Sequence, residues 1–199
     1  MEVSESGISF EFPEGTSVQK FDDSCFYRGL FTALPYAKGV DFISNNRDTF
    51  SMIEVKNCRG DEGNNRWRIA PNNQKRDTTH TEHNVEDRDS LDIEVAEKVT
   101  MTLAALLGAG TFQDKKETAK ELADFYQVLM SDGVAKDKKK ILVVLFLEGN
   151  FATKTRNEKM ILKELQDSLQ KKLRWLNCRV SVVNSNTYKK GPFDSARVV

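Results

Sequence analysis

The stretch KGVDFISNNRDTFSMIEVKN, from Lys38 to Asn57, holds two short apolar runs separated by polar residues. The residues between the runs, NNRD at 45–48, suit a tight turn because Asn and Asp tolerate left-handed backbone angles. The runs themselves, 40–44 and 49–56, have the length and composition of strands. This stretch therefore predicts a β-hairpin.

Both predicted strands carry charged side chains. Side chains on a strand alternate between its two faces, so Glu54 and Lys56 point one way and Val55 the other. Asp41, on the neighbouring strand, is within reach of the face with Glu54 and Lys56. A charged trio inside a strand pair is unfavourable unless something compensates it. A divalent cation would do so, because two carboxylates and the Val55 carbonyl offer the oxygen ligands that Mg²⁺ prefers.

Asp41, a hairpin and then Glu54-Val55-Lys56 resemble the PD-(D/E)XK nuclease superfamily, which has the restriction endonuclease-like fold. In that superfamily an Asp begins one strand of the hairpin and (D/E)XK lies on the next. The usual order after an opening helix is three strands, a helix and a fourth strand, often followed by a further helix and strand. The resemblance extends from about Lys20 to Val183 and is to small bacterial members whose motif reads roughly gvDfi…iEvKn.

The resemblance implies hydrolysis of a nucleic-acid phosphodiester that depends on Mg²⁺ or Mn²⁺, with DNA as the expected substrate. It implies that Asp41, Glu54 and the Val55 carbonyl hold the metal ion and that Lys56 is the catalytic lysine. Lys56 would then hold an attacking water or stabilise negative charge developing on a phosphate.

The resemblance also implies a further acid, because the first helix of such nucleases often supplies one. Asp22 and Asp23 are equal candidates for this accessory acid. The chain departs from the superfamily pattern in two respects. Val40 stands directly before Asp41, where the motif has Pro, and only two strands are evident before the helices.

The polar segment 57–90 has no sustained period and predicts a long loop. Basic residues surround an aromatic residue in this loop, which suits a surface that follows a nucleic-acid backbone and stacks on bases. The alternative is a solvated loop with its Trp packed onto the core. The candidate nucleic-acid contacts, including one lysine from the following helix, are Arg66, Trp67, Arg68, Lys75, Arg76 and Lys98.

The remaining pattern predicts an α/β or α+β sandwich, in which helices flank a mixed central β-sheet. The continuous apolar run within 138–149 is typical of a strand buried on both faces, and 178–183 predicts one more strand. Helices are predicted at 17–34, 91–107, 114–130 and 157–176. We expect one domain over 1–199, with its core at about 17–188 and a flexible tail at 189–199.

The composition predicts a folded, cytoplasmic protein. Hydrophobic residues make up 39% and charged residues 30% of the chain, as in ordinary globular domains. No apolar run approaches the roughly 20 residues that span a bilayer, and the acidic N-terminus does not resemble a secretory signal. Three widely spaced cysteines favour reduced thiols over a disulfide framework.

The 30 basic and 30 acidic residues give a net charge of zero, which argues against strong non-specific binding to nucleic acid. Sequence specificity would then come from loops, a homodimer or a partner protein. Two alternatives remain. One is a non-catalytic module of the same fold that binds nucleic acid or protein, and the other is a structural domain in which Glu54 and Lys56 are surface charges. The nuclease differs from the non-catalytic module in whether Asp41, Glu54 and Lys56 converge on one accessible site. The structural domain predicts that Glu54→Ala changes stability by only about a few tenths of a kcal/mol.

Overall fold

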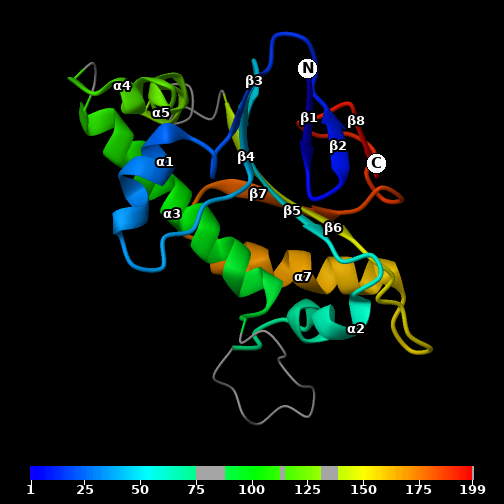
Figure 1. Cartoon of the computed structure of the whole chain (residues 1–199). Coiled ribbons are helices and arrows are strands. Elements are labelled where there is room, and N and C mark those ends of the chain that lie inside the picture. Colours follow the sequence, from blue (N-terminus) through cyan, green and yellow to red (C-terminus); the bar gives the residue numbers. More distant parts are fainter. Residues whose placement is uncertain (75–87, 113–114, 131–138, 199) are drawn as a thin grey trace.

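A five-stranded mixed sheet forms the centre of the fold in the computed structural model, which describes residues 1–74, 88–112, 115–130 and 139–198 (Figure 1). The strand order is β3-β4-β5-β6-β7. Strand β4 is antiparallel to both of its neighbours, whereas β5, β6 and β7 are parallel to one another. The strands are β3 (Ser17–Lys20), β4 (Phe42–Asn45), β5 (Thr49–Asn57), β6 (Lys140–Glu148) and β7 (Cys178–Val183).

The predicted hairpin is confirmed, and it consists of β4 and β5. Its turn is held by Asn46, whose N–H donates to the Thr49 carbonyl at 3.0 Å. The Asn46 side-chain oxygen also accepts from the backbone N–H groups of Asp48, at 3.0 Å, and Thr49, at 2.9 Å. The last pair of the ladder is Phe42 with Ile53. Asp41 and Glu54 are therefore the next opposed positions.

Helices cover one face of the central sheet. The long helix α3 (Leu91–Phe112) lies between β5 and β6 in the chain, and α7 (Glu158–Lys172) connects β6 to β7. Asn157 caps the N-terminus of α7, and its side chain accepts a hydrogen bond from the Met160 N–H at 2.9 Å. Within the described residues, no helix combines the length and apolarity needed to cross a membrane.

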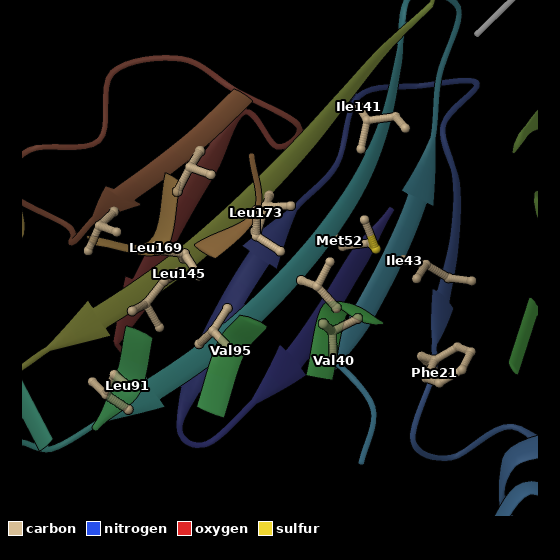
Figure 2. Packing of buried hydrophobic residues seen from close by; sticks show 14 of the residues in the cluster. Phe21, Val40, Ile43, Met52, Leu91, Val95, Ile141, Leu145, Leu169 and Leu173 are labelled. Carbon is tan, nitrogen blue, oxygen red and sulfur yellow. The ribbon is translucent and has the colours of Figure 1, made fainter. Parts of the chain in front are cut away.

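The core under these helices is a continuous apolar cluster (Figure 2). Leu91 and Val95 come from α3, Leu169 from α7, and Met52 and Leu145 from the sheet. All five side chains are buried. The two shorter helices α4 (Glu117–Lys120) and α5 (Ala123–Met130) add to this layer, where a single helix at 114–130 was predicted.

The opposite face of the central sheet is covered by a second sheet rather than by helices (Figure 1). This three-stranded antiparallel sheet has the order β1-β2-β8, with β1 at Glu2–Glu5, β2 at Ile8–Glu11 and β8 at Ser195–Val198. The layer between the two sheets is rich in aromatic side chains. Its buried members are Ile8, Phe10, Phe12, Phe42, Ile53, Val55, Val144, Phe146 and Phe193.

Three further expected elements differ from the structure. Residues 17–34 were predicted as one helix but form β3, the helix α1 (Cys25–Gly29) and the short 3₁₀ helix η1 (Phe31–Ala33). Strand β3 is therefore a third strand of the central sheet ahead of α3, and α1 lies between it and β4. The tail at 189–199, expected to be flexible, contains β8 paired with β2. The expected loop at 57–90 contains α2 (Glu62–Asn65) and the 3₁₀ helix η2 (Arg66–Ile69), and its segment 75–87 lies outside the described residues.

Candidate active site

Two carboxylates meet where the β4–β5 ladder ends. Asp41 and Glu54 follow the final pair of the ladder, so both point to the helical face of the sheet. The Asp41 Oδ2 atom accepts a hydrogen bond from the Val55 N–H at 2.7 Å. Asp41 is 7% exposed and Glu54 is fully buried. The hairpin therefore brings the two predicted metal-binding acids together.

The backbone before Asp41 is held tightly against the rest of the fold. A Cβ on Gly39 would lie 2.6 Å from the Phe21 ring, so a larger residue would displace that ring. The Val40 N–H donates to the Thr102 hydroxyl of α3 at 3.1 Å, and the Phe21 N–H donates to the Asp41 carbonyl at 2.9 Å. These contacts fix the position of Asp41 between β3 and α3.

Two lysines converge on one oxygen of Glu54. The Lys56 Nζ lies 2.8 Å and the Lys98 Nζ lies 2.6 Å from Glu54 Oε1. Lys56 shares the β5 face with Glu54, whereas Lys98 comes from α3, which crosses that face. Lys98 Nζ is also 3.8 Å from Asp41 Oδ1. The second Glu54 oxygen, Oε2, is buried and has no hydrogen-bond partner within the described part of the chain.

An outer pair of charges completes the cluster. Glu94 lies one turn before Lys98 on α3, and its two oxygens contact different cations. Its Oε1 is 3.1 Å from Lys56 Nζ, and its Oε2 is 2.7 Å from Arg68 Nη2. Arg68 also donates to the Asn65 side-chain oxygen at 3.0 Å. We call Asp41, Glu54, Lys56, Arg68, Glu94 and Lys98 the charged cluster.

Burial and neighbouring charges shift the pKa values of this cluster in opposite directions. Burial, followed by the charge of Glu54, raises the pKa of Asp41 to about 7. Burial would also raise the pKa of Glu94, but the charges of Lys56, Arg68 and Lys98 outweigh it and lower that pKa to about 2. Burial opposes the charged form of Lys56, yet Glu54 and Glu94 raise its pKa above the ordinary value. Lys56 is therefore a cation at neutral pH.

The two accessory-acid candidates have different environments. Asp23 is exposed and forms ion pairs with Lys20, at 3.5 Å, and with Arg28. Asp22 has a buried oxygen, Oδ1, without a hydrogen-bond partner among the described residues. Burial is the main cause of its raised pKa, and the charge of Lys98 acts in the opposite direction. Asp22 thus lies within the electrostatic influence of the charged cluster and is the better candidate.

The predicted nucleic-acid contacts are only partly at the surface. Trp67 is 2% exposed, which does not fit the predicted base-stacking role. This burial agrees with the alternative, in which Trp67 packs onto the core. Arg68 is buried against Glu94 rather than turned toward solvent. Arg66 is exposed. Lys98 belongs to the charged cluster, and Lys75 and Arg76 lie outside the described residues.

Sequence reasoning missed Glu94. The pattern contains one signal that could have identified it, because Glu94 and Lys98 are four residues apart and so lie on the same side of a helix. A charged pair at that spacing, on the first long helix after the motif hairpin, places Glu94 on the same side of the helix as Lys98.

The oxygen atoms of Asp41, Glu54 and the Val55 carbonyl suit a hard divalent cation. Among the described residues, no three His, Cys, Asp or Glu side chains gather closely enough to hold a metal ion by themselves. Mg²⁺ is commonly held by only one or two carboxylates plus waters. In an extended strand the N–H and C=O of a residue point to the same side, so the Val55 carbonyl points toward Asp41 as its N–H does. The unpartnered Glu54 Oε2 is a further oxygen suited to a cation.

One protein-family model, described as a family of unknown function (DUF6661), matches residues 24–196. The matched region contains the hairpin, α3 and all members of the charged cluster. No curated protein matches the chain. No solved structure matches it either.

Proposed function

The chain belongs to the DUF6661 family, and we propose that it is a metal-dependent nuclease of the PD-(D/E)XK class, which hydrolyses phosphodiester bonds of nucleic acid, with DNA as the expected substrate. The observation that carries this proposal is the convergence of Asp41, Glu54 and Lys56 at the end of one hairpin. An ordinary surface ion pair would not have a fully buried carboxylate at its centre.

The order of the elements supports the proposal. Of the strands of the central sheet, β3, β4 and β5 precede α3, and β6, α7 and β7 follow. This is the strand and helix order expected for the restriction endonuclease-like fold. Strands β1 and β2 also precede α3 but belong to the second sheet. One difference is the position of the short helix α1, which lies between β3 and β4 instead of before the first strand.

The roles of the residues follow from their chemistry. Asp41, Glu54 and the Val55 carbonyl would hold Mg²⁺ or Mn²⁺. Such an ion supplies Lewis-acid polarisation of the scissile phosphate. Lys56 is cationic and fixed by Glu54 and Glu94, so it acts as a hydrogen-bond donor to the phosphate or to the attacking water, not as a base. Asp41 must lose its proton before it can bind a cation.

The net charge bears on how the protein would recognise its substrate. A net charge of zero argues against strong non-specific binding to nucleic acid. Specificity would therefore depend on contacts close to the charged cluster, on a homodimer or on a partner protein.

The test is cleavage of single-stranded DNA, duplex DNA and RNA by the wild-type protein in Mg²⁺ and in Mn²⁺. We expect Glu54→Gln and Lys56→Met each to reduce the rate by about 100-fold or more. Lys163→Met is the control, because Lys163 pairs with Asp167 on the exposed side of α7 and should leave the rate unchanged. Cleavage that persists undiminished in Glu54→Gln would refute the assignment.

A second candidate function is a non-catalytic module of the same fold that binds nucleic acid or a protein. The observation that favours it is that Glu54 is fully buried and that two lysines already neutralise its Oε1. A nucleic acid that binds the wild type and Glu54→Gln equally, with no cleavage by either, would favour this module over the nuclease.

A further inference from the structure

Lys98 has an unusual position in the charged cluster. Its Nζ is 2.6 Å from Glu54 Oε1 and 3.8 Å from Asp41 Oδ1, so it is close to both proposed metal-binding carboxylates. A divalent cation held by the same two carboxylates would need the same space. We propose that the Lys98 ammonium occupies the cation position and has to move away when a metal ion binds. This inference rests on the proposed function.

The charge balance of the cluster supports competition between the Lys98 ammonium and a metal ion for this position. Three carboxylates, Asp41, Glu54 and Glu94, face three cations, Lys56, Arg68 and Lys98. The cluster is therefore neutral when Asp41 is ionised. A divalent ion would add two positive charges to a largely buried region, which is unfavourable unless one cation leaves.

Lys98 is the cation best able to leave. Lys56 is held by carboxylates on two elements, Glu54 and Glu94. Arg68 is 4% exposed and is held by Glu94 and Asn65. Lys98 has one short contact, to Glu54, and its second carboxylate contact, to Asp41, is longer at 3.8 Å. Its ammonium sits at the end of a flexible stem. Rotation of this stem would carry the ammonium from between the carboxylates toward solvent, where a phosphate of the substrate would approach.

The test is the affinity of the metal-free protein for Mn²⁺, measured by calorimetry and by electron paramagnetic resonance without nucleic acid. Lys98→Met removes the charge and keeps an unbranched side chain. We expect this variant to bind Mn²⁺ about tenfold more tightly than the wild type, or more, because a like charge near the ion is gone. The matched control is Lys38→Met. Lys38 pairs with Glu97 of the same helix at 2.6 Å but lies outside the cluster, so its removal should not change the affinity.

The outcomes separate this inference from the proposed function. Equal or weaker Mn²⁺ binding by Lys98→Met, with measurable binding by the wild type, would overturn the inference and leave the nuclease proposal standing. If the double variant Lys98→Met/Glu54→Gln still binds Mn²⁺ as tightly as Lys98→Met does, the ion lies away from Glu54, and the inference is overturned. No binding in any variant would overturn both. Circular dichroism checks that each variant is folded, and Lys98→Gln replaces Lys98→Met if the latter unfolds.

Discussion

Glu94 illustrates what a single residue contributes to this fold. It joins Lys56 of β5 to Arg68 of η2, two cations that are twelve positions apart in the chain and both largely buried. A buried guanidinium without a counter-ion is strongly unfavourable. Glu94 therefore stabilises the position of Arg68, and with it the packing of the segment that follows the hairpin.

We expect Glu94→Gln to lower the free energy of unfolding at pH 7 by about 3 kcal/mol, because it leaves two buried cations with less compensation. The pKa of Glu94 is about 2 in the folded protein, below its ordinary value of 4.5. The stabilisation is therefore fully present above pH 4.5 and is lost as the pH falls toward 2. Urea unfolding at pH 7 and pH 3 measures this.

The control for this substitution is Glu97→Gln on the same helix. Glu97 pairs with Lys38 near the surface, where such a pair contributes at most about 1 kcal/mol. A difference between wild type and Glu94→Gln that is as large at pH 3 as at pH 7 would contradict the assigned pKa.

At the scale of elements, the second sheet explains why the C-terminal segment is ordered. Phe193 is 1% exposed and stacks on Tyr188, with ring centroids 4.2 Å apart. It also meets the edges of Phe10 of β2, at 5.0 Å, and Phe146 of β6, at 5.9 Å. This aromatic cluster packs the segment just before β8 against β2 and the central sheet.

Phe193→Ala should lower the free energy of unfolding by about 3–5 kcal/mol, because it removes a large side chain from a filled layer. Chemical denaturation of the full chain measures the change. Val198→Ala in β8 is the control, since this side chain is 37% exposed, and we expect it to change stability by about 0.5 kcal/mol or less. An effect of Phe193→Ala as small as that of the control would mean that the segment is loose in solution.

The sequence patterns predicted the long elements better than the short ones. The helix expected at 91–107 is α3, and the strand expected at 138–149 is β6. The strands β1, β2, β3 and β8 have only four residues each, so their periodicity is too short to identify them. Strand β4 is equally short, but the turn residues that follow it identified the hairpin. The alternation of Ile8, Phe10 and Phe12 was the available signal for β2.

At the scale of the whole molecule, the charged cluster depends on three elements that are distant in the sequence. The hairpin supplies Asp41, Glu54 and Lys56, α3 supplies Glu94 and Lys98, and η2 supplies Arg68. The contact between Lys98 and Glu54 spans 44 positions. Since the cluster exists only when α3 lies on the sheet, a ligand bound there should stabilise the global fold.

We expect Mn²⁺ to raise the melting temperature of the wild-type protein. At about 100 times the dissociation constant, the stabilisation is about 2.7 kcal/mol. Glu54→Gln should show no such rise, because it removes a charged metal ligand. Differential scanning calorimetry with Mn²⁺ and with EDTA measures both proteins. An equal rise in both would mean that Mn²⁺ stabilises the fold from a site that does not include Glu54.

The sequence by itself determined the hairpin and the approach of Asp41 to Glu54. These depend on a local turn and on the two-residue period of strands, both of which are set over fewer than 20 positions. The tertiary structure decided that Lys98 and Glu94 join the cluster, that Trp67 packs onto the core instead of stacking on bases, that Arg68 is buried, and that a second sheet covers the other face. These features depend on how α3 and the chain termini pack against the central sheet, and such distant contacts leave no fixed spacing in the sequence.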